Sequence, residues 1–277
     1  MVAANAGRRV GTAPPGAPAG LGARAARFAA LGEPVRLAMV EHLALGDAAP
    51  SELGALVDLP SNLLAHHLKV LEDADVVRRV RSEGDRRRSY VRLRLDDPAV
   101  AALVSPPLAW ADGRLDAAGG ATRVLFVCTH NSARSQLAAA AWQHVSDLPV
   151  ASAGTQPAPR VHPRAVAAAR RHGLHLAGQR TRRLDETAQP GDLLVAVCDN
   201  AYEDLGPAPT TTGARGSTGR RSPGGDDAVP DRGGVQLHWS IPDPVRIDTD
   251  DAFETAYEDI DLRVQHLADT LGRHVET

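Results

Sequence analysis

Val124-Leu-Phe-Val-Cys-Thr-His-Asn-Ser-Ala-Arg-Ser-Gln136 is the stretch that decides the fold of the second half of the chain. Its apolar run at residues 124–127 predicts a buried strand, and the Ala-rich residues 132–144 predict a helix. The backbone N–H groups of the loop between them can surround a tetrahedral oxyanion, and the planar guanidinium of Arg134 can donate two hydrogen bonds to the same oxyanion. The predicted oxyanion-binding residues are Thr129, His130, Asn131, Ser132, Ala133 and Arg134.

Cys128 opens this loop. Helix N-termini and nearby cations lower the pKa of a cysteine thiol from about 8.5 to roughly 3.5–7.5. We therefore expect a thiolate nucleophile beside an anion site.

Composition limits the classes of protein to which the chain can belong. Its 277 residues are enough for two domains, and its net charge of -3 gives no general polycation signal. The two cysteines offer neither a disulfide framework nor a zinc spacing, which favours a reducing cytoplasm. Residues 1–20 are rich in Ala, Gly and Pro and are predicted to be a disordered leader, and no apolar run is long enough to span a membrane.

Helical periodicity dominates the first third of the chain. Apolar residues recur at helical spacing over residues 21–30 and 33–45, and Ser51 is predicted to cap a short helix over residues 52–57. After a turn at residues 59–61, a helix over residues 62–74 has Leu64, Leu68 and Leu71 on one face. Strand patterns at residues 76–81 and 89–95 flank a tip at residues 82–88. Residues 21–110 are therefore predicted to form a winged helix-turn-helix domain, mainly helical with a β wing.

Residues 65–74, Ala-His-His-Leu-Lys-Val-Leu-Glu-Asp-Ala, and the Gly-Asp-Arg of the wing resemble the arsenic- and metal-responsive repressor (ArsR) family. The resemblance implies a homodimer that binds double-stranded operator DNA, with the helix at residues 62–74 in the major groove. It places Ser61, Asn62, Ala65 and His66 near base edges, and Lys69, Arg86, Arg87 and Arg88 near phosphates.

The chain departs from that family at its usual metal sites. Residues 51–58 contain no cysteine, and no histidine occurs between His67 and His130, so we predict no metal or arsenite site there and no bound cofactor. Residues 99–110 match the family's dimerisation helix, although Pro106 and Pro107 must interrupt it. The Gly- and Ala-rich residues 111–122 are predicted to be the linker.

Strand and helix patterns alternate through residues 123–277. Residues 150–155 predict a strand, 162–172 a helix, 192–197 a strand that ends at Cys198, and 250–271 an amphipathic helix. This alternation predicts a doubly wound α/β domain with a parallel sheet and a ligand at the carboxyl ends of its strands. Cys128 and Cys198 are both predicted at such ends.

Four motifs of this half resemble arsenate reductases built on the low-molecular-weight tyrosine phosphatase fold. They are the sequences at residues 128–136, 152–155, 178–180 and 238–244. The resemblance implies that Cys128 attacks the oxyanion, Arg134 and the loop amides bind it, Ser135 hydrogen-bonds the thiolate, and Asp243 protonates the departing oxygen.

Two positions favour a small inorganic substrate, arsenate with phosphate as its analogue. Gln136 replaces the proline usual in the phosphatases, and Val245-Arg246 replaces the tyrosines that often stack on an aryl substrate. A low-molecular-weight tyrosine phosphatase, or an oxyanion-sensing regulator with incidental turnover, remain the rival interpretations. Weak phosphatase activity is expected in any case.

The reductant is left open by the sequence. Cys198 matches the second cysteine of thioredoxin-coupled reductases, but Leu205 occupies the position of the third. Either Cys198 attacks Cys128 and an external partner reopens the disulfide, or a low-molecular-weight thiol attacks directly, with mycothiol or thioredoxin as the external reductant. Cys198 as a buried small apolar residue is an equal alternative. Residues 206–234 are low in complexity and are predicted to be a disordered insertion.

Overall fold

The computed structural model describes residues 20–104, 120–206 and 236–275. The predicted leader lies outside these ranges, except for Gly20. So do residues 105–110 of the predicted dimerisation helix, most of the predicted linker, and all but Gly206 of the predicted insertion. No helix within the described ranges is both long enough and apolar enough to cross a membrane.

The first part of the chain folds as the predicted winged helix-turn-helix. Leu64, Leu68 and Leu71 of the fourth helix are buried in a core that also takes in Val77 and Val91 of the wing. The wing strands pair antiparallel. The elements in order are α1 Leu21–Leu31, α2 Pro34–Leu45, α3 Pro50–Leu56, α4 Ser61–Asp73, β1 Val77–Arg81, β2 Ser89–Leu93 and α5 Pro98–Val104.

The prediction that Ser51 caps α3 is wrong. The helix begins two residues earlier than predicted, at Pro50, and Ser51 lies inside its first turn. Proline is well suited to the first helical position, because its fixed φ is helical and its missing N–H would have no partner there. The carboxylate of Glu52 accepts a hydrogen bond from the Ala49 N–H at 2.6 Å, so the start of α3 is satisfied without a hydroxyl cap.

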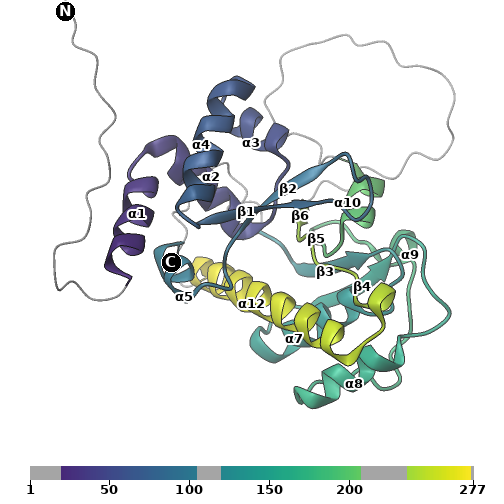
Figure 1. Ribbon diagram of the computed structural model, residues 1–277. Helices are drawn as coiled ribbons and strands as arrows, with labels where there is room; N and C mark the ends of the chain where they lie inside the picture. The colour runs from purple at the N-terminus through teal and green to yellow at the C-terminus, as the bar shows by residue number, and fades with distance from the viewer. Residues whose placement is uncertain (1–19, 105–119, 207–235, 276–277) are drawn as a thin grey trace, which may run out of the picture.

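The second part is a parallel sheet with helices packed against it, as predicted. Its strands lie in the order β4-β3-β5-β6, and every pairing is parallel. Long helix α12 runs alongside α7 (Figure 1). The elements are β3 Arg123–Cys128, α7 Arg134–Val145, β4 Val150–Gly154, α8 Pro163–Arg171, α9 Leu184–Thr187, β5 Asp192–Ala196, α10 Asp199–Leu205, β6 Gln236–His238, α11 Pro244–Ile247 and α12 Asp250–Val275.

The two parts pack directly against each other. Leu45 at the end of α2 joins the apolar core of the second part, and its carbonyl accepts a hydrogen bond from the Trp239 indole N–H at 3.0 Å. A Cβ at Gly46 would lie 2.8 Å from the His238 carbonyl oxygen, so only glycine fits there. This docking brings the β1–β2 wing across to α10 (Figure 1), at the carboxyl edge of the parallel sheet.

Candidate active site and DNA-binding surface

The loop between β3 and α7 has its carbonyl groups turned outward. Four of them accept hydrogen bonds of 2.8–3.2 Å from backbone N–H groups of residues 155–162. The C=O of a trans peptide points opposite to the N–H of the next residue, so the N–H groups that follow these carbonyls point into the loop. Such a ring of amides is suited to an anion. The accepting carbonyls belong to Cys128, Thr129, His130 and Ser132.

Asn131 holds the shape of this loop. It is fully buried and has a left-handed backbone with φ 48°, which asparagine tolerates better than most residues. Its Nδ2 donates to Ser135 Oγ at 2.9 Å and Ser152 Oγ at 3.0 Å. Its Oδ1 accepts from Gln136 Nε2 at 3.1 Å and from the Arg182 N–H at 2.8 Å. The hydrogen bonds of the Asn131 side chain therefore hold the loop in this shape without a ligand.

Cys128 lies at the floor of the loop and is 3% exposed. Its Sγ is 3.0 Å from Ser135 Oγ and accepts a hydrogen bond from the Asn131 N–H at 3.2 Å. Both groups can donate to a thiolate, and the N-terminus of α7 adds a favourable dipole. Ser135 Oγ thus lies within hydrogen-bond distance of Cys128 Sγ, and its bond to a thiolate nucleophile stays a prediction.

Arg134 lies buried at the rim of the loop. Its Nη1 donates to the Ile241 carbonyl at 2.9 Å, and its Nη2 lies 3.3 Å from Asp243 Oδ1. Burial alone would lower the pKa of Arg134, but the negative charges of Cys198, Asp243, Cys128 and Glu83 raise the pKa overall. The guanidinium is therefore a permanent cation at the position predicted to bind the oxyanion.

Asp243 reaches the site from the segment after β6. Its Oδ1 accepts from the Val245 N–H at 3.2 Å and so caps α11. This local bond and the pairing with Arg134 hold the carboxyl group beside the loop. The resemblance to the arsenate reductases predicts a proton donor at this position. The side chain is 15% exposed, which leaves it accessible to a ligand.

Cys198 lies at the carboxyl end of β5, next to β3 in the sheet. Its Sγ accepts from the Ala201 N–H at 3.4 Å and lies 3.6 Å from Thr129 Oγ1. Burial raises the pKa of the Cys198 thiol, Arg134 opposes this, and Cys128 raises the pKa further. Both cysteines are free and buried.

One residue that lies at this site, Glu83, was not predicted from the sequence. It lies at the tip of the wing, and its Oε2 is 3.5 Å from Arg134 Nη1. Nothing in the sequence near Glu83 indicates this contact, because a charged residue in a hairpin tip is normally solvated.

The predicted DNA-contacting residues lie on exposed surface. Ser61, Asn62, Ala65, His66 and Lys69 are exposed on α4, and Asn62, His66 and Lys69 lie on the face opposite its buried leucines. The three wing arginines at residues 86–88 are also exposed.

Some of these cations have acidic neighbours. Arg87 Nε lies 3.0 Å and Arg88 Nε 3.7 Å from the Asp85 carboxylate. Lys69 pairs with Asp73 at 3.0 Å. These exposed pairs are weak and can exchange for phosphate contacts.

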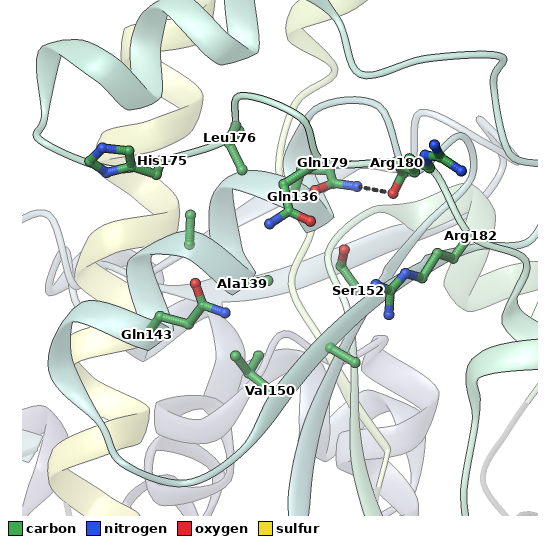
Figure 2. A pocket seen from close by; sticks show the side chains of 12 residues that line it. Gln136, Ala139, Gln143, Val150, Ser152, His175, Leu176, Gln179, Arg180 and Arg182 are labelled. Carbon is green, nitrogen blue, oxygen red and sulfur yellow. Dashed lines mark hydrogen bonds between the residues drawn. The ribbon is translucent and has the colours of Figure 1, made fainter.

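A polar pocket of about 160 Å³ lies behind the loop, between α7, β4 and residues 175–182. Figure 2 shows Gln136, Ser152 and Arg182 in its wall; all three hydrogen-bond Asn131. The pocket thus borders the residues that support the loop, and Cys128 does not line it. Within the described ranges, no three or more His, Cys, Asp or Glu side chains are grouped to hold a metal ion.

Comparison with known proteins finds a family match in each part of the chain. Residues 123–220 match the family described as low molecular weight phosphotyrosine protein phosphatase. Residues 31–80 match a helix-turn-helix domain family. No curated protein matches the chain.

Solved structures similar to this chain align with about half of it. The arsenate reductase from Archaeoglobus fulgidus DSM 4304 is 26% identical, with 52% of this chain and 98% of that chain covered and a TM-score of 0.38. The tyrosine phosphatase Wzb from Escherichia coli K30, in complex with sulphate, is 24% identical, with coverages of 55% and 99% and a TM-score of 0.42. A YwlE mutant from Bacillus subtilis is 19% identical, with the same coverages and TM-score.

Proposed function

From a chain that joins a helix-turn-helix domain to a low molecular weight phosphotyrosine protein phosphatase domain, we propose a thiol-dependent arsenate reductase fused to a DNA-binding regulator of the arsenic-resistance type. One observation carries the proposal. A buried second thiol, Cys198, lies at the end of the strand beside the nucleophile Cys128 and contacts the oxyanion loop through Thr129.

The first step is attack of the Cys128 thiolate on arsenate. The loop amides and Arg134 bind the arsenate oxygens, and the Ser135 hydroxyl, 3.0 Å from the sulfur, stabilises the thiolate. A sulfur–arsenic bond forms, and one arsenate oxygen leaves as water after Asp243 donates a proton. Arsenic is still pentavalent at this stage.

The second step transfers two electrons to arsenic. A second thiolate attacks Cys128 Sγ, a disulfide forms, and the sulfur–arsenic bond breaks with its electron pair left on arsenic, which departs as arsenite. Cys198 is one candidate for this thiol, after it has lost its proton. An external low-molecular-weight thiol such as mycothiol is the other. In both routes an external reductant, mycothiol- or thioredoxin-linked, restores the reduced enzyme.

A phosphatase is the alternative supported by the family match of residues 123–220. Phosphatase chemistry ends with attack of water on the covalent phosphorus intermediate and has no use for a second thiol. The placement of Cys198 therefore favours reduction. Gln136 is the other favourable feature, since it serves the Asn131 scaffold where the phosphatases usually have proline.

The DNA-binding half of the proposal is supported by the surface of α4. Its polar, exposed face carries Asn62, His66 and Lys69, while its leucines anchor it to the core. A recognition helix needs this arrangement to enter a major groove.

The test is arsenite production from arsenate by the purified chain, with a thioredoxin system and a mycothiol–mycoredoxin system in parallel. Turnover with either is expected, and the ratio of arsenate to aryl phosphate turnover separates reductase from phosphatase. Cys128→Ser should abolish both activities. Cys198→Ser should abolish only arsenate reduction if Cys198 is the resolving thiol, and should leave it intact if an external thiol takes that role.

Retained arsenate reduction in Cys128→Ser would overturn the mechanism. Absence of turnover with both systems, combined with DNA binding that still responds to arsenate, would favour an oxyanion-sensing regulator.

A further inference from the structure

The tip of the wing, residues 82–85, is docked onto α10 at the edge of the active site. The Glu83 N–H donates to Asp199 Oδ2 at 2.8 Å, and the Asp85 N–H donates to Glu203 Oε2 at 2.9 Å. The Ser82 hydroxyl donates to Glu203 Oε1 at 2.6 Å. Three groups of the hairpin tip are thus bound by two carboxylates of the phosphatase-like domain.

The docked position has little freedom. A Cβ at Gly84 would lie 2.5 Å from Glu203 Oε2 and 2.6 Å from Asn200 Oδ1, so the backbone of the tip is in direct contact with α10. The Tyr90 hydroxyl, at the base of the tip, donates to Glu203 Oε1 at 2.9 Å. The side chain of Glu83 is therefore held in a defined place.

That place is inside the active site. The two carboxylate oxygens of Glu83 lie 3.2 and 3.0 Å from the Asp243 N–H. Oε2 also lies 3.5 Å from Arg134 Nη1. One carboxylate from the DNA-binding domain thus contacts both the cation and the segment of the proton donor in the proposed mechanism.

We propose that Glu83, contributed by the winged-helix domain, is a negative charge at the oxyanion site that weakens the binding of dianionic oxyanions and couples their binding to release of the wing tip. The proposal rests on the proposed function, because it takes the loop after Cys128 to be an oxyanion site. The role of Glu83 and the coupling to the wing go beyond that function.

The electrostatic reason is the charge balance around Arg134. Its single positive charge already faces the carboxylates of Asp243 and Glu83. A dianion that binds to the same guanidinium is repelled by Glu83, and a carboxylate this close to a partly buried site lowers anion affinity by on the order of tenfold.

Linkage makes the effect reciprocal. If the docked tip weakens oxyanion binding, a bound oxyanion weakens docking of the tip by the same factor. The tip carries Arg86, Arg87 and Arg88 with it. Substrate in the catalytic site would then alter the surface that the wing presents to DNA.

The experiment measures binding of inorganic phosphate at pH 8 by calorimetry. We expect Glu83→Gln and Glu83→Ala to bind phosphate about tenfold more tightly than the unmodified chain. Asp85→Asn is the matched control, since it removes the same charge from the same tip but the Asp85 carboxylate pairs with Arg87; it should change phosphate affinity much less.

The Gln and Ala variants separate charge from shape. Gln keeps an oxygen that can accept from the Asp243 N–H, whereas Ala does not. A gain in affinity with both variants supports the electrostatic role. Unchanged or weaker binding with Glu83→Gln would overturn it, whether or not the protein reduces arsenate. If the Glu83 variants bind phosphate more tightly but the unmodified chain produces no arsenite, the role of Glu83 stands and only the proposed reductase activity is refuted.

Hydrogen exchange gives a second readout that does not depend on activity. In the unmodified chain, saturating phosphate should accelerate exchange of the Glu83 and Asp85 amides several-fold, because their bonds to Asp199 and Glu203 are broken more often. In Glu83→Gln the same phosphate should have little effect. Slower exchange of these amides with phosphate in the unmodified chain would refute the coupling.

Discussion

Replacing Asp47 by asparagine should loosen the contact between the two domains. Asp47 has a fully buried side chain in the segment that follows α2. Its Oδ1 accepts from Arg263 Nη2 at 2.9 Å, and its Oδ2 accepts from the Ser240 N–H at 2.7 Å. Arg92 Nε, on the wing strand β2, lies 3.5 Å from the same Oδ2.

The magnitude follows from what the substitution leaves behind. Removing one partner of a buried ion pair costs about 3–5 kcal/mol. Asparagine keeps one oxygen that can accept a bond, and Asp259 still pairs with Arg92 at 2.5 Å and Arg263 at 3.0 Å. We therefore expect the low end of that range, about 3 kcal/mol, which is roughly a 150-fold change in an opening equilibrium.

Hydrogen exchange at residue 47 measures this opening directly. The backbone N–H of residue 47 donates to the His238 carbonyl at 2.7 Å across the domain contact, and it remains present in Asp47→Asn. Protection of that amide should fall by about two orders of magnitude. The control is Asp58→Asn, which makes the same chemical change at an exposed residue with φ 49°, where asparagine is tolerated. Protection within threefold of the unmodified chain would refute the assignment of the docking energy to this ion-pair network.

Three further predictions concern the loop and the acid response. Asn131→Ala should unfold at a temperature about 2–4 °C lower than Asn131→Gly. Both variants lose the side-chain hydrogen bonds, but alanine in addition is destabilised by about 1 kcal/mol in the left-handed backbone with φ 48°. An alanine variant that is more stable than the glycine variant would contradict this. Gly154→Ala should lower phosphate affinity and aryl phosphate turnover at least tenfold, since its Cβ would lie 2.8 Å from the Thr129 carbonyl oxygen; wild-type kinetics would show that the loop can shift without cost. Burial alone would raise the pKa of Asp259, but Arg263 and Arg92 outweigh it and lower the pKa. Its contribution to stability is therefore complete above the unfolded pKa of about 3.9 and is lost as pH falls through the folded value. Protection at residue 47 should stay level from pH 7 to 5 and decline below about pH 4; a decline already between pH 7 and 5 would exclude Asp259 as its cause.

Local sequence patterns were sufficient for the elements that carry the proposed chemistry. The apolar run of β3, the loop and the start of α7 lie within a dozen residues, and strand and helix periods are local properties. The same holds for α4 and for the wing strands. The predicted start of α3 was two residues too late because two local signals compete there, a proline at the first helical position and a hydroxyl cap.

The spatial grouping of the site was only partly predictable. Parallel strands place their carboxyl ends at one edge, so Cys128 and Cys198 could be expected together from alternation alone. Asp243 could be assigned to the site only from the resemblance of residues 238–244 to the arsenate reductases. The interlocked bonds of Asn131 with Gln136, Ser152 and Arg182 needed the folded chain, because they join segments 5 to 51 residues apart.

What the sequence determined by itself is the pair of domains and the reactive loop, because both follow from short-range periodicity and from residues at fixed offsets. What only the tertiary structure decided is that a side chain of the first domain, Glu83, reaches the candidate active site of the second. Glu83 meets Asp243 across 160 residues of chain, and it does so because buried charges around Asp47 and the missing side chain of Gly46 set the docking of the wing. No local pattern encodes that geometry, since a polar hairpin tip has the same sequence character whether it faces water, DNA or a neighbouring domain.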